Sequence, residues 1–268
     1  GMVYDPKGEA MHKSKGNAVA PQDVLVKYGA DAFRYWAVSS VIGEDLWYQE
    51  RELQHAQKLL IKLWNVAKFV EMWKVKPKKF KPSNTIDSWI MSRLSQVTKK
   101  FIETFDNYDP VTAKKELENF FWHEYCDFYL EMIKYRLYGQ DKEAKESAEQ
   151  TLYSTFYKIL KMFAPIIPHM AEELYQELFK EKEISVHLTQ ISEVEPVDPE
   201  AVELGNLAAD IISEIRKYKA SKGLGPGAEM EKLTVKHPDV KAEKVLDEVA
   251  KTCRIKHLHI EKGELKVE

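Results

Sequence analysis

The residues best suited to chemistry lie in a short basic stretch near the N-terminus, residues 11–17, with Lys13, Ser14 and Lys15 at its centre. Gly16 and Asn17 follow, and both residue types tolerate left-handed turn geometry. Such a loop can bring ammonium and backbone N–H groups to a polyphosphate, where they stabilise the negative charge that develops during nucleotidyl transfer. A solvated basic turn has the same composition, so the loop alone leaves both interpretations open.

A second set of candidates consists of cations further along the chain. Residues 74–82 contain five lysines, two prolines and no acid, which predicts an extended basic linker. Lys78 and Lys79 of this linker, with Arg93, Lys99 and Lys100 on the helix expected after it, could follow an RNA backbone. A solvated lysine-rich surface is an equally good explanation, because the net charge of −3 gives no general case for nucleic-acid binding.

Other familiar sites are not supported by the residue pattern. No phosphate-binding G-x-x-x-x-G-K-[ST] or G-x-G-x-x-G motif occurs, and the glycines of residues 223–227 have neither that spacing nor a preceding strand. His257 and His259 share one face of an expected strand, where surface positions explain them better than a metal, so we expect no metal site. Cys126 and Cys253 are far apart in sequence, which excludes a disulfide framework and indicates a reducing compartment.

Hydrophobic periodicity predicts that most of the chain is helical. Apolar residues recur every three or four positions from Leu53 to Val70, and the same period returns in four further segments: residues 85–106, 110–138, 141–163 and 168–178. Short turns join these segments, which favours an antiparallel helix bundle. Before the bundle we expect two short helices, the second with Asp31 as its N-cap, and after it a short extended piece at residues 186–188.

The composition changes after an acidic, proline-bearing stretch at residues 193–199, which we take as a domain boundary. Beyond it, one helix, two alternating strands (residues 232–237 and 255–260) and a helix between them predict a small α/β domain. We therefore expect a mainly α fold in three parts, comprising residues 1–48, 49–192 and 200–268. No apolar run is long enough to cross a bilayer, and we expect a cytoplasmic monomer without a membrane partner.

Seven landmarks in this order resemble the C-terminal half of class I aminoacyl-tRNA synthetases of the valine, isoleucine and leucine branch. The stretch at 11–17 resembles the signature loop written K-M-S-K-S, and the other landmarks are residues 27–34, 43–45, 62–65, 87–93, 125–131 and 164–174. Gly-Glu-Asp at 43–45 followed by Leu-Trp-Asn at 63–65 is most similar to the valyl-tRNA synthetases, and the small α/β tail to their archaeal type.

This resemblance implies roles for the basic loop. Lys13 matches the lysine that stabilises the transition state, and Lys13, Ser14 and Lys15 together would contact ATP. Ala10 and His12 depart from the signature, where a lysine and a serine stand. The H-I-G-H signature of the nucleotide-binding half occurs nowhere in the chain.

We therefore expect the chain to be the anticodon-binding C-terminal part of a valine–tRNA ligase. Its parent would activate valine with ATP and charge tRNA, whereas this part alone would be inactive and would not retain ATP. Three alternatives stay open: an isoleucine- or leucine-specific relative, a stand-alone RNA-binding helical module without catalysis, and a purely structural bundle.

Overall fold

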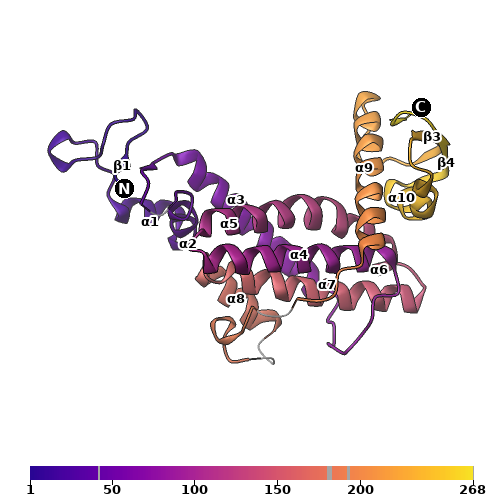
Figure 1. Cartoon of the computed structure of the whole chain (residues 1–268), viewed down its shortest axis with the longest axis horizontal. Coiled ribbons are helices and arrows are strands. Elements are labelled where there is room, and N and C mark those ends of the chain that lie inside the picture. The colour runs from indigo at the N-terminus through magenta and orange to yellow at the C-terminus, as the bar shows by residue number, and fades with distance from the viewer. Residues whose placement is uncertain (42, 180–182, 192–193, 268) are drawn as a thin grey trace. The chain divides into compact units, whose positions relative to one another are not determined.

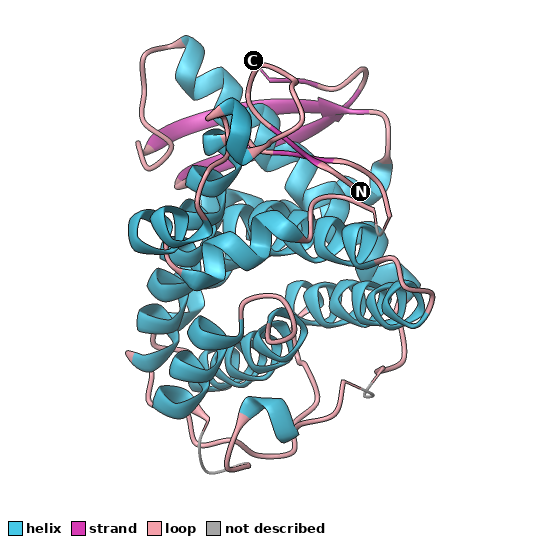
Figure 2. Cartoon of the chain, turned by 90° about the vertical axis from the view of Figure 1, so that its left-hand side faces the viewer, coloured by secondary structure: helices cyan, strands magenta, loops and turns pink. Residues whose placement is uncertain are grey.

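The structure is a computed structural model that describes residues 1–41, 43–179, 183–191 and 194–267. The chain forms two compact units, neither of which is continuous in sequence. The first unit comprises Gly1–Val75, Val97–Phe120 and Tyr153–Val194, and the second comprises Lys76–Gln96, Phe121–Leu152 and Glu195–Glu268. Helices dominate and the described strands belong to two small sheets (Figures 1 and 2), which confirms the expected mainly α fold.

The first unit is built from helices around an apolar core. Its complete elements are β1 (Val3–Tyr4), η1 (Lys13–Lys15), α1 (Pro21–Tyr28), α2 (Ala30–Ala37), β2 (Leu46–Trp47), α3 (Glu50–Glu71), α5 (Pro110–Asn119), α8 (Pro168–Leu178) and η3 (Val186–Leu188). The C-terminal halves of α4 (Thr85–Asp106) and α7 (Lys142–Phe163) complete it. In α3 the predicted apolar face is buried, except that Leu59 takes the place expected for Leu60.

Asp31 was predicted to cap its own helix, and this prediction is wrong. α2 begins at Ala30, two residues earlier than an Asp31 cap requires, and Asp31 lies within its first turn with only 7% of its surface exposed. Its carboxylate instead accepts hydrogen bonds from the backbone N–H groups of His169 (3.2 Å) and Met170 (2.6 Å). These N–H groups begin α8 and have no partner within that helix, so Asp31 caps a helix 138 residues further along the chain.

The expected extended piece at residues 186–188 is also wrong. Val186–Leu188 forms a single 3₁₀ turn, and the Ser185 hydroxyl accepts a hydrogen bond from the His187 N–H at 3.2 Å. A serine in this position offers the backbone a local cap, which favours a turn over a strand. In the predicted domain boundary at residues 193–199, residue 193 lies outside the described residues, residues 194–198 carry no regular element, and α9 begins at Pro199.

The second unit contains a departure from α-helical geometry that the sequence analysis missed. A continuous α-helix was predicted for residues 110–138, but Phe120–Tyr129 forms a π-helical segment, η2, between α5 and α6 (Leu130–Leu137). Phe120 and Cys126 are buried in this segment, and Phe121, Tyr125 and Tyr129 have no exposed surface at all. The last three step by four residues, which is wider than the 3.6 residues of an α-helical turn and fits a π segment. Phe128, which an α-helical step of three from Tyr125 would place on the buried face, is half-buried.

The C-terminal part of this unit is the small α/β structure that the sequence predicted. Its elements are α9 (Pro199–Ser221), β3 (Met230–His237), η4 (Val240–Val245), α10 (Leu246–Cys253), β4 (Ile255–Lys262) and β5 (Lys266–Val267). β3 and β4 pair in parallel and are joined through α10, while β5 pairs antiparallel with β3, giving the strand order β4-β3-β5. The helix predicted between the two strands begins as the 3₁₀ segment η4 and continues as α10. The two-residue β5 was not predicted, because an element this short leaves no periodicity.

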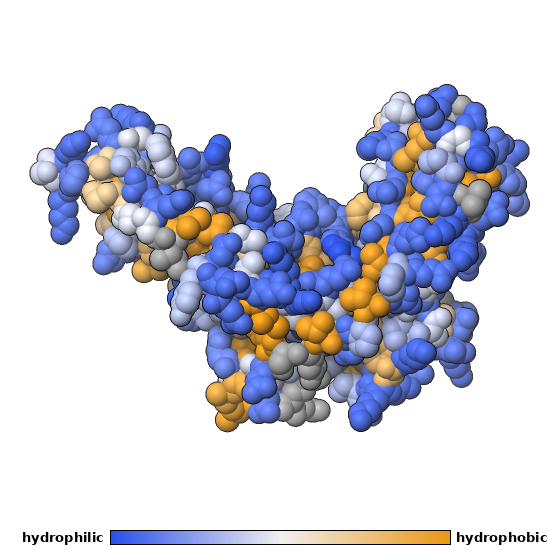
Figure 3. Space-filling model, in the orientation of Figure 1, coloured by the Kyte–Doolittle hydropathy of each residue, from blue (hydrophilic) through white to orange (hydrophobic). Residues whose placement is uncertain are grey.

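Figure 3 shows a face that is largely hydrophilic, with apolar areas between the hydrophilic residues. None of the helices among the described residues has the length and hydropathy needed to span a bilayer.

Candidate nucleic-acid interface

The basic loop at residues 11–17 is held by one side chain. Lys13–Lys15 form a 3₁₀ turn that ends at Gly16, which adopts a left-handed φ of 67°. Asn17 does not share this conformation; its Oδ1 accepts a hydrogen bond from the His12 N–H (2.9 Å), and its Nδ2 donates to the Ala10 carbonyl (3.2 Å). The Asn17 side chain therefore links the two ends of the loop by hydrogen bonds, and its backbone does not form the turn.

The buried carboxylate of Asp5 holds the Asn17 side chain in place. Asp5 is 7% exposed, and its Oδ2 accepts a hydrogen bond from Asn17 Nδ2 at 3.1 Å. Its Oδ1 accepts from the N–H groups of Lys7 and Glu9, both at 2.9 Å. The Glu9 N–H is the main cause that lowers the pKa of Asp5 from its ordinary value of 3.8, and Asn17 contributes. Because the folded pKa is lowered, this support is complete above the ordinary pKa and is lost only as pH falls through the lowered value.

The three loop residues predicted to contact phosphate are open to solvent. Lys13, Ser14 and Lys15 are all exposed. Lys15 Nζ lies 3.6 Å from Glu9 Oε2, with both side chains more than half exposed, so water and salt screen this ion pair strongly. The loop thus presents polar side chains outward on a fixed backbone, a geometry suited to an anionic ligand.

The basic linker lies along α7. The amide of Gln150, which is 6% exposed, accepts a hydrogen bond from the Lys78 N–H (3.2 Å) and donates one to the Lys76 carbonyl (2.9 Å). Lys78 Nζ also pairs with Glu146, again on α7. Lys79 is exposed next to it. The linker carries no helix or strand, and its backbone is anchored at Lys76 and Lys78.

The cations predicted on the following helix differ in their surroundings. Arg93 is only 27% exposed at its side chain and forms a two-pronged ion pair with Glu124, through Nε (2.7 Å) and Nη2 (2.8 Å). Lys99 and Lys100 are exposed. Lys78, Lys79 and Arg93 belong to the second unit, whereas Lys99 and Lys100 belong to the first. The predicted interface is thus divided between the units, and its role in tRNA binding stays a prediction.

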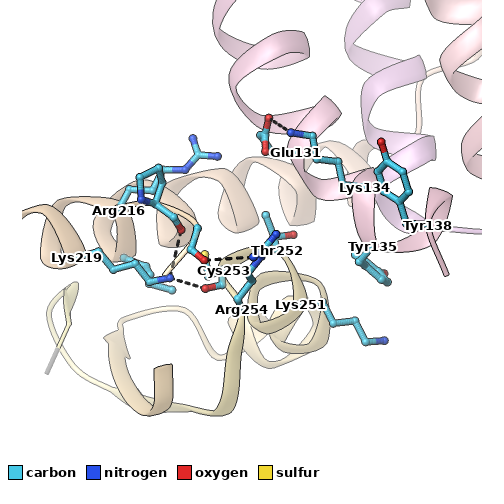
Figure 4. A pocket seen from close by; sticks show the side chains of 13 residues that line it. Glu131, Lys134, Tyr135, Tyr138, Arg216, Lys219, Lys251, Thr252, Cys253 and Arg254 are labelled. Carbon is cyan, nitrogen blue, oxygen red and sulfur yellow. Dashed lines mark hydrogen bonds and ion pairs between the residues drawn. The ribbon is translucent and has the colours of Figure 1, made fainter. Parts of the chain in front are cut away.

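Sequence reasoning missed a cationic pocket of about 450 Å³ in the second unit, lined by α6, α9, α10 and the loop after α9 (Figure 4). Lys219 lines this pocket from the last turn of α9, a position where cations are common because they interact favourably with the helix dipole. The structure buries it to 1% exposure. A signal was present in the sequence, because Lys219 follows the apolar series Ile211, Ile212 and Ile215 at the spacing of the same helix face.

No cluster of three or more metal-ligating side chains occurs in the described part of the chain. His257 and His259 are both exposed on β4, while Leu258 between them is buried, in agreement with surface strand positions.

Two stretches of the chain match known protein families. Residues 87–235 match the family described as anticodon-binding domain of tRNA ligase, and residues 1–49 match the family described as tRNA synthetases class I (I, L, M and V). The chain is 40% identical to a valine–tRNA ligase of Pyrococcus furiosus, with 100% of this chain and 31% of that protein covered. It is 36% identical to a valine–tRNA ligase of Methanothermobacter thermautotrophicus, with 98% and 30% covered. The chain thus spans about a third of the length of these curated relatives.

Solved structures share the fold at low sequence identity. LeuRS of Agrobacterium radiobacter K84, in a ternary complex with tRNA and LeuAMS, matches with a TM-score of 0.53 and 15% identity over 100% of this chain and 32% of that one. A Mycobacterium tuberculosis methionyl-tRNA synthetase matches with a TM-score of 0.51 and 19% identity, over 73% and 42%. With the family match covering more than half of its residues, the chain belongs to the class I tRNA ligases and carries their anticodon-binding domain.

Proposed function

We propose that the chain is the C-terminal, anticodon-binding part of a valine–tRNA ligase of archaeal type. The observation that carries this proposal is the similarity along the full chain, at 34–40% identity, to valine–tRNA ligases from six archaea. The parent enzyme activates valine with ATP and transfers it to tRNA. This chain supplies the tRNA-binding surface and the basic loop that contacts ATP.

The three parts expected from the sequence have separate tasks in this proposal. Residues 1–48 are the end of the catalytic domain, residues 49–192 are the anticodon-binding bundle, and residues 200–268 are an appended α/β domain. Bound ATP supplies the activated phosphate, and the exposed side chains of Lys13, Ser14 and Lys15 fit a polyphosphate. We assign the neutralising ammonium to Lys13, because it matches the transition-state lysine of the signature loop that residues 11–17 resemble.

For tRNA binding, the exposed cations make the contacts and the paired ones hold the surface in place. Lys79, Lys99 and Lys100 offer ammonium groups to phosphates. Lys78 and Arg93 are already paired with Glu146 and Glu124, so they must exchange a carboxylate for a phosphate before they contribute. We therefore expect the exposed lysines to account for most of the salt dependence.

Titration of the 268-residue chain with valine-accepting tRNA at several salt concentrations tests the proposal. We expect binding that weakens as salt rises, because each neutralised phosphate releases counterions. The triple variant Lys79→Ala, Lys99→Ala, Lys100→Ala should flatten the log–log slope by about 0.7–0.9 for each phosphate that is no longer neutralised. The matched control replaces the exposed lysines Lys7, Lys115 and Lys142 by alanine and should leave the slope unchanged.

The same titration separates the alternative functions. A tRNA whose anticodon is changed from valine to isoleucine or leucine should bind more weakly than the valine tRNA. Stronger binding of the exchanged tRNA would reassign the specificity, and equal binding of all three would favour a general RNA-binding module. Binding that is undetectable at low salt, or indifferent to salt, would favour a structural bundle.

We expect the isolated chain to catalyse no valine-dependent exchange between ATP and pyrophosphate. The physical reason is that the loop offers phosphate contacts only, whereas adenylate formation also needs an enclosed site for the amino acid and the adenosine. Exchange is measured with labelled pyrophosphate, and a full-length archaeal valine–tRNA ligase is the positive control. Robust turnover by this chain, lost in Lys13→Ala, would show that the fragment is an enzyme by itself.

A further inference from the structure

Cationic and aromatic side chains make up most of the lining of the cationic pocket in the second unit. It has a volume of about 450 Å³, within the range of sites that bind small organic ligands. Five cationic side chains line it; Lys134 is paired with the acidic lining residue Glu131, and Lys251 is paired with Asp247, both at 2.6 Å. The cations come from three helices and the turn after the last of them: Lys134, Arg216, Lys219, Lys251 and Arg254 (Figure 4).

The ammonium group of Lys219 places a positive charge next to the pocket without contacting a ligand directly. Its Nζ donates hydrogen bonds to three backbone carbonyls, those of Pro226 (3.3 Å), Ala228 (2.6 Å) and Cys253 (2.5 Å). An ammonium group has three protons, so all of them are used. Burial lowers the pKa of Lys219, because its charged form has lost water. An anion in the pocket would stabilise that charge.

Arg254 occupies a backbone position that does not favour arginine. It ends α10 with a left-handed φ of 54°, where glycine or asparagine is usual because a side chain is strained there. Its side chain is exposed, and its hydrogen bond to the Gly227 carbonyl is long at 3.4 Å. Glycine would adopt this backbone conformation with less strain. We therefore infer that arginine is present at position 254 for its guanidinium group.

Aromatic rings stand beside these cations. Tyr138, at the end of α6, is 61% exposed and lies at the pocket with its ring accessible (Figure 4). Tyr135 lines the same wall, with the ammonium of Lys251 5.0 Å from its ring centre. An exposed ring next to clustered cations matches the two needs of a single-stranded nucleotide, a stacking surface for the base and positive charge for the phosphate.

We propose that this pocket binds one nucleotide of single-stranded RNA, with the phosphate near Arg216 and Arg254 and the base stacked on Tyr138. The inference rests on the proposed function, since it takes the RNA to be an unpaired segment of tRNA. It adds a contact made by the α6, α9 and α10 pocket to those of the linker and α4. Lys219 acts as a positioning residue, holding the loop at Pro226 and the end of α10 together.

The test measures binding of the full 268-residue chain to a labelled single-stranded RNA heptamer and to tRNA at low salt, with an RNA duplex for comparison. Arg254→Gly removes the guanidinium while relieving the left-handed strain, so its melting temperature should be no lower than that of the parent chain. We expect about tenfold weaker binding of the heptamer by Tyr138→Ala. For Arg254→Gly we expect the log–log salt slope to become shallower by about 0.7. Lys256→Ala, two residues from Arg254 but outside the pocket and paired with Glu231, is the matched control and should bind normally.

Each outcome decides between the pocket and the proposed function. If tRNA binds and both pocket variants bind as the parent chain does, the pocket is refuted while the proposed function stands. If both variants weaken heptamer binding but exchanged anticodons bind equally, the pocket stands and the anticodon assignment fails. Competition with inorganic phosphate as effective as with AMP would reduce the site to a simple anion site and overturn the base contact. If neither heptamer nor tRNA binds, both inferences fall.

Discussion

Replacing Asp87 by asparagine is expected to destabilise the second unit by about 3–5 kcal/mol, the usual loss when one partner of a buried ion pair is removed. Asp87 is fully buried and Arg136 is 3% exposed. The guanidinium of Arg136 donates to both carboxylate oxygens, at 2.6 and 2.9 Å. The hydroxyls of Tyr129 (3.2 Å) and Ser147 (2.7 Å) also donate to Asp87. Asparagine keeps the volume but leaves the arginine charge buried without a counter-ion.

Urea unfolding followed by circular dichroism measures this loss. Asp106→Asn, at an exposed position of the same helix α4, is the control and should change the unfolding free energy by less than about 0.5 kcal/mol. The double variant Asp87→Asn, Arg136→Met should recover part of the loss, because it removes both charges. An Asp87→Asn chain that unfolds at the same urea concentration as the parent would show that the ion pair is not needed for stability.

Gly205→Ala should have the next largest effect, a loss of about 3 kcal/mol, at the upper end for overpacked cores. A Cβ at Gly205 would lie 2.0 Å from Cγ of Trp89 and 2.4 Å from two further ring atoms. Trp89 has no room to yield, since it is 1% exposed and its indole N–H donates to Asn206 Oδ1 at 3.0 Å. On propensity alone, alanine in the middle of α9 would be preferred over glycine by about 1 kcal/mol. Packing therefore outweighs propensity here.

Thermal unfolding of matched glycine variants checks this expectation. At Gly225 a Cβ would meet open space, so Gly225→Ala should melt within a few degrees of the parent chain. In a Trp89→Leu background the smaller side chain makes room, and adding Gly205→Ala should then cost less than it does in the parent. Equal costs in the two backgrounds would mean that the clash with Trp89 is not the cause.

The helices were predictable because their signals are local. The apolar period from Leu53 to Val70 needs only neighbouring residues, and α3 covers it. Asn84, directly before α4, is of a residue type favoured at N-caps, and its Oδ1 accepts a hydrogen bond from the Ile86 N–H. The π segment was missed because a step of four residues between aromatic positions can be read as an α-helical face until the burial of Tyr129 in place of Phe128 is known.

The site was less predictable because its partners are distant in sequence. The loop lysines and the basic linker could be found from composition, and the structure leaves Lys13 and Lys79 exposed. The capping role of Asp31, the anchoring of the linker by Gln150 and the buried ammonium of Lys219 depend on segments brought together by folding. A residue type at one position says nothing of a carbonyl or N–H group that arrives from far along the chain.

The interleaving of the two compact units limits how this protein can be divided at the level of its gene. Each unit draws on three separate stretches of chain, and α4 and α7 each contribute residues to both. A stop codon or recombination breakpoint between residues 76 and 194 therefore disrupts both units. Recombination between relatives must exchange residues 76–194 as one block, whereas exchange after residue 195 leaves every stretch of the first unit intact.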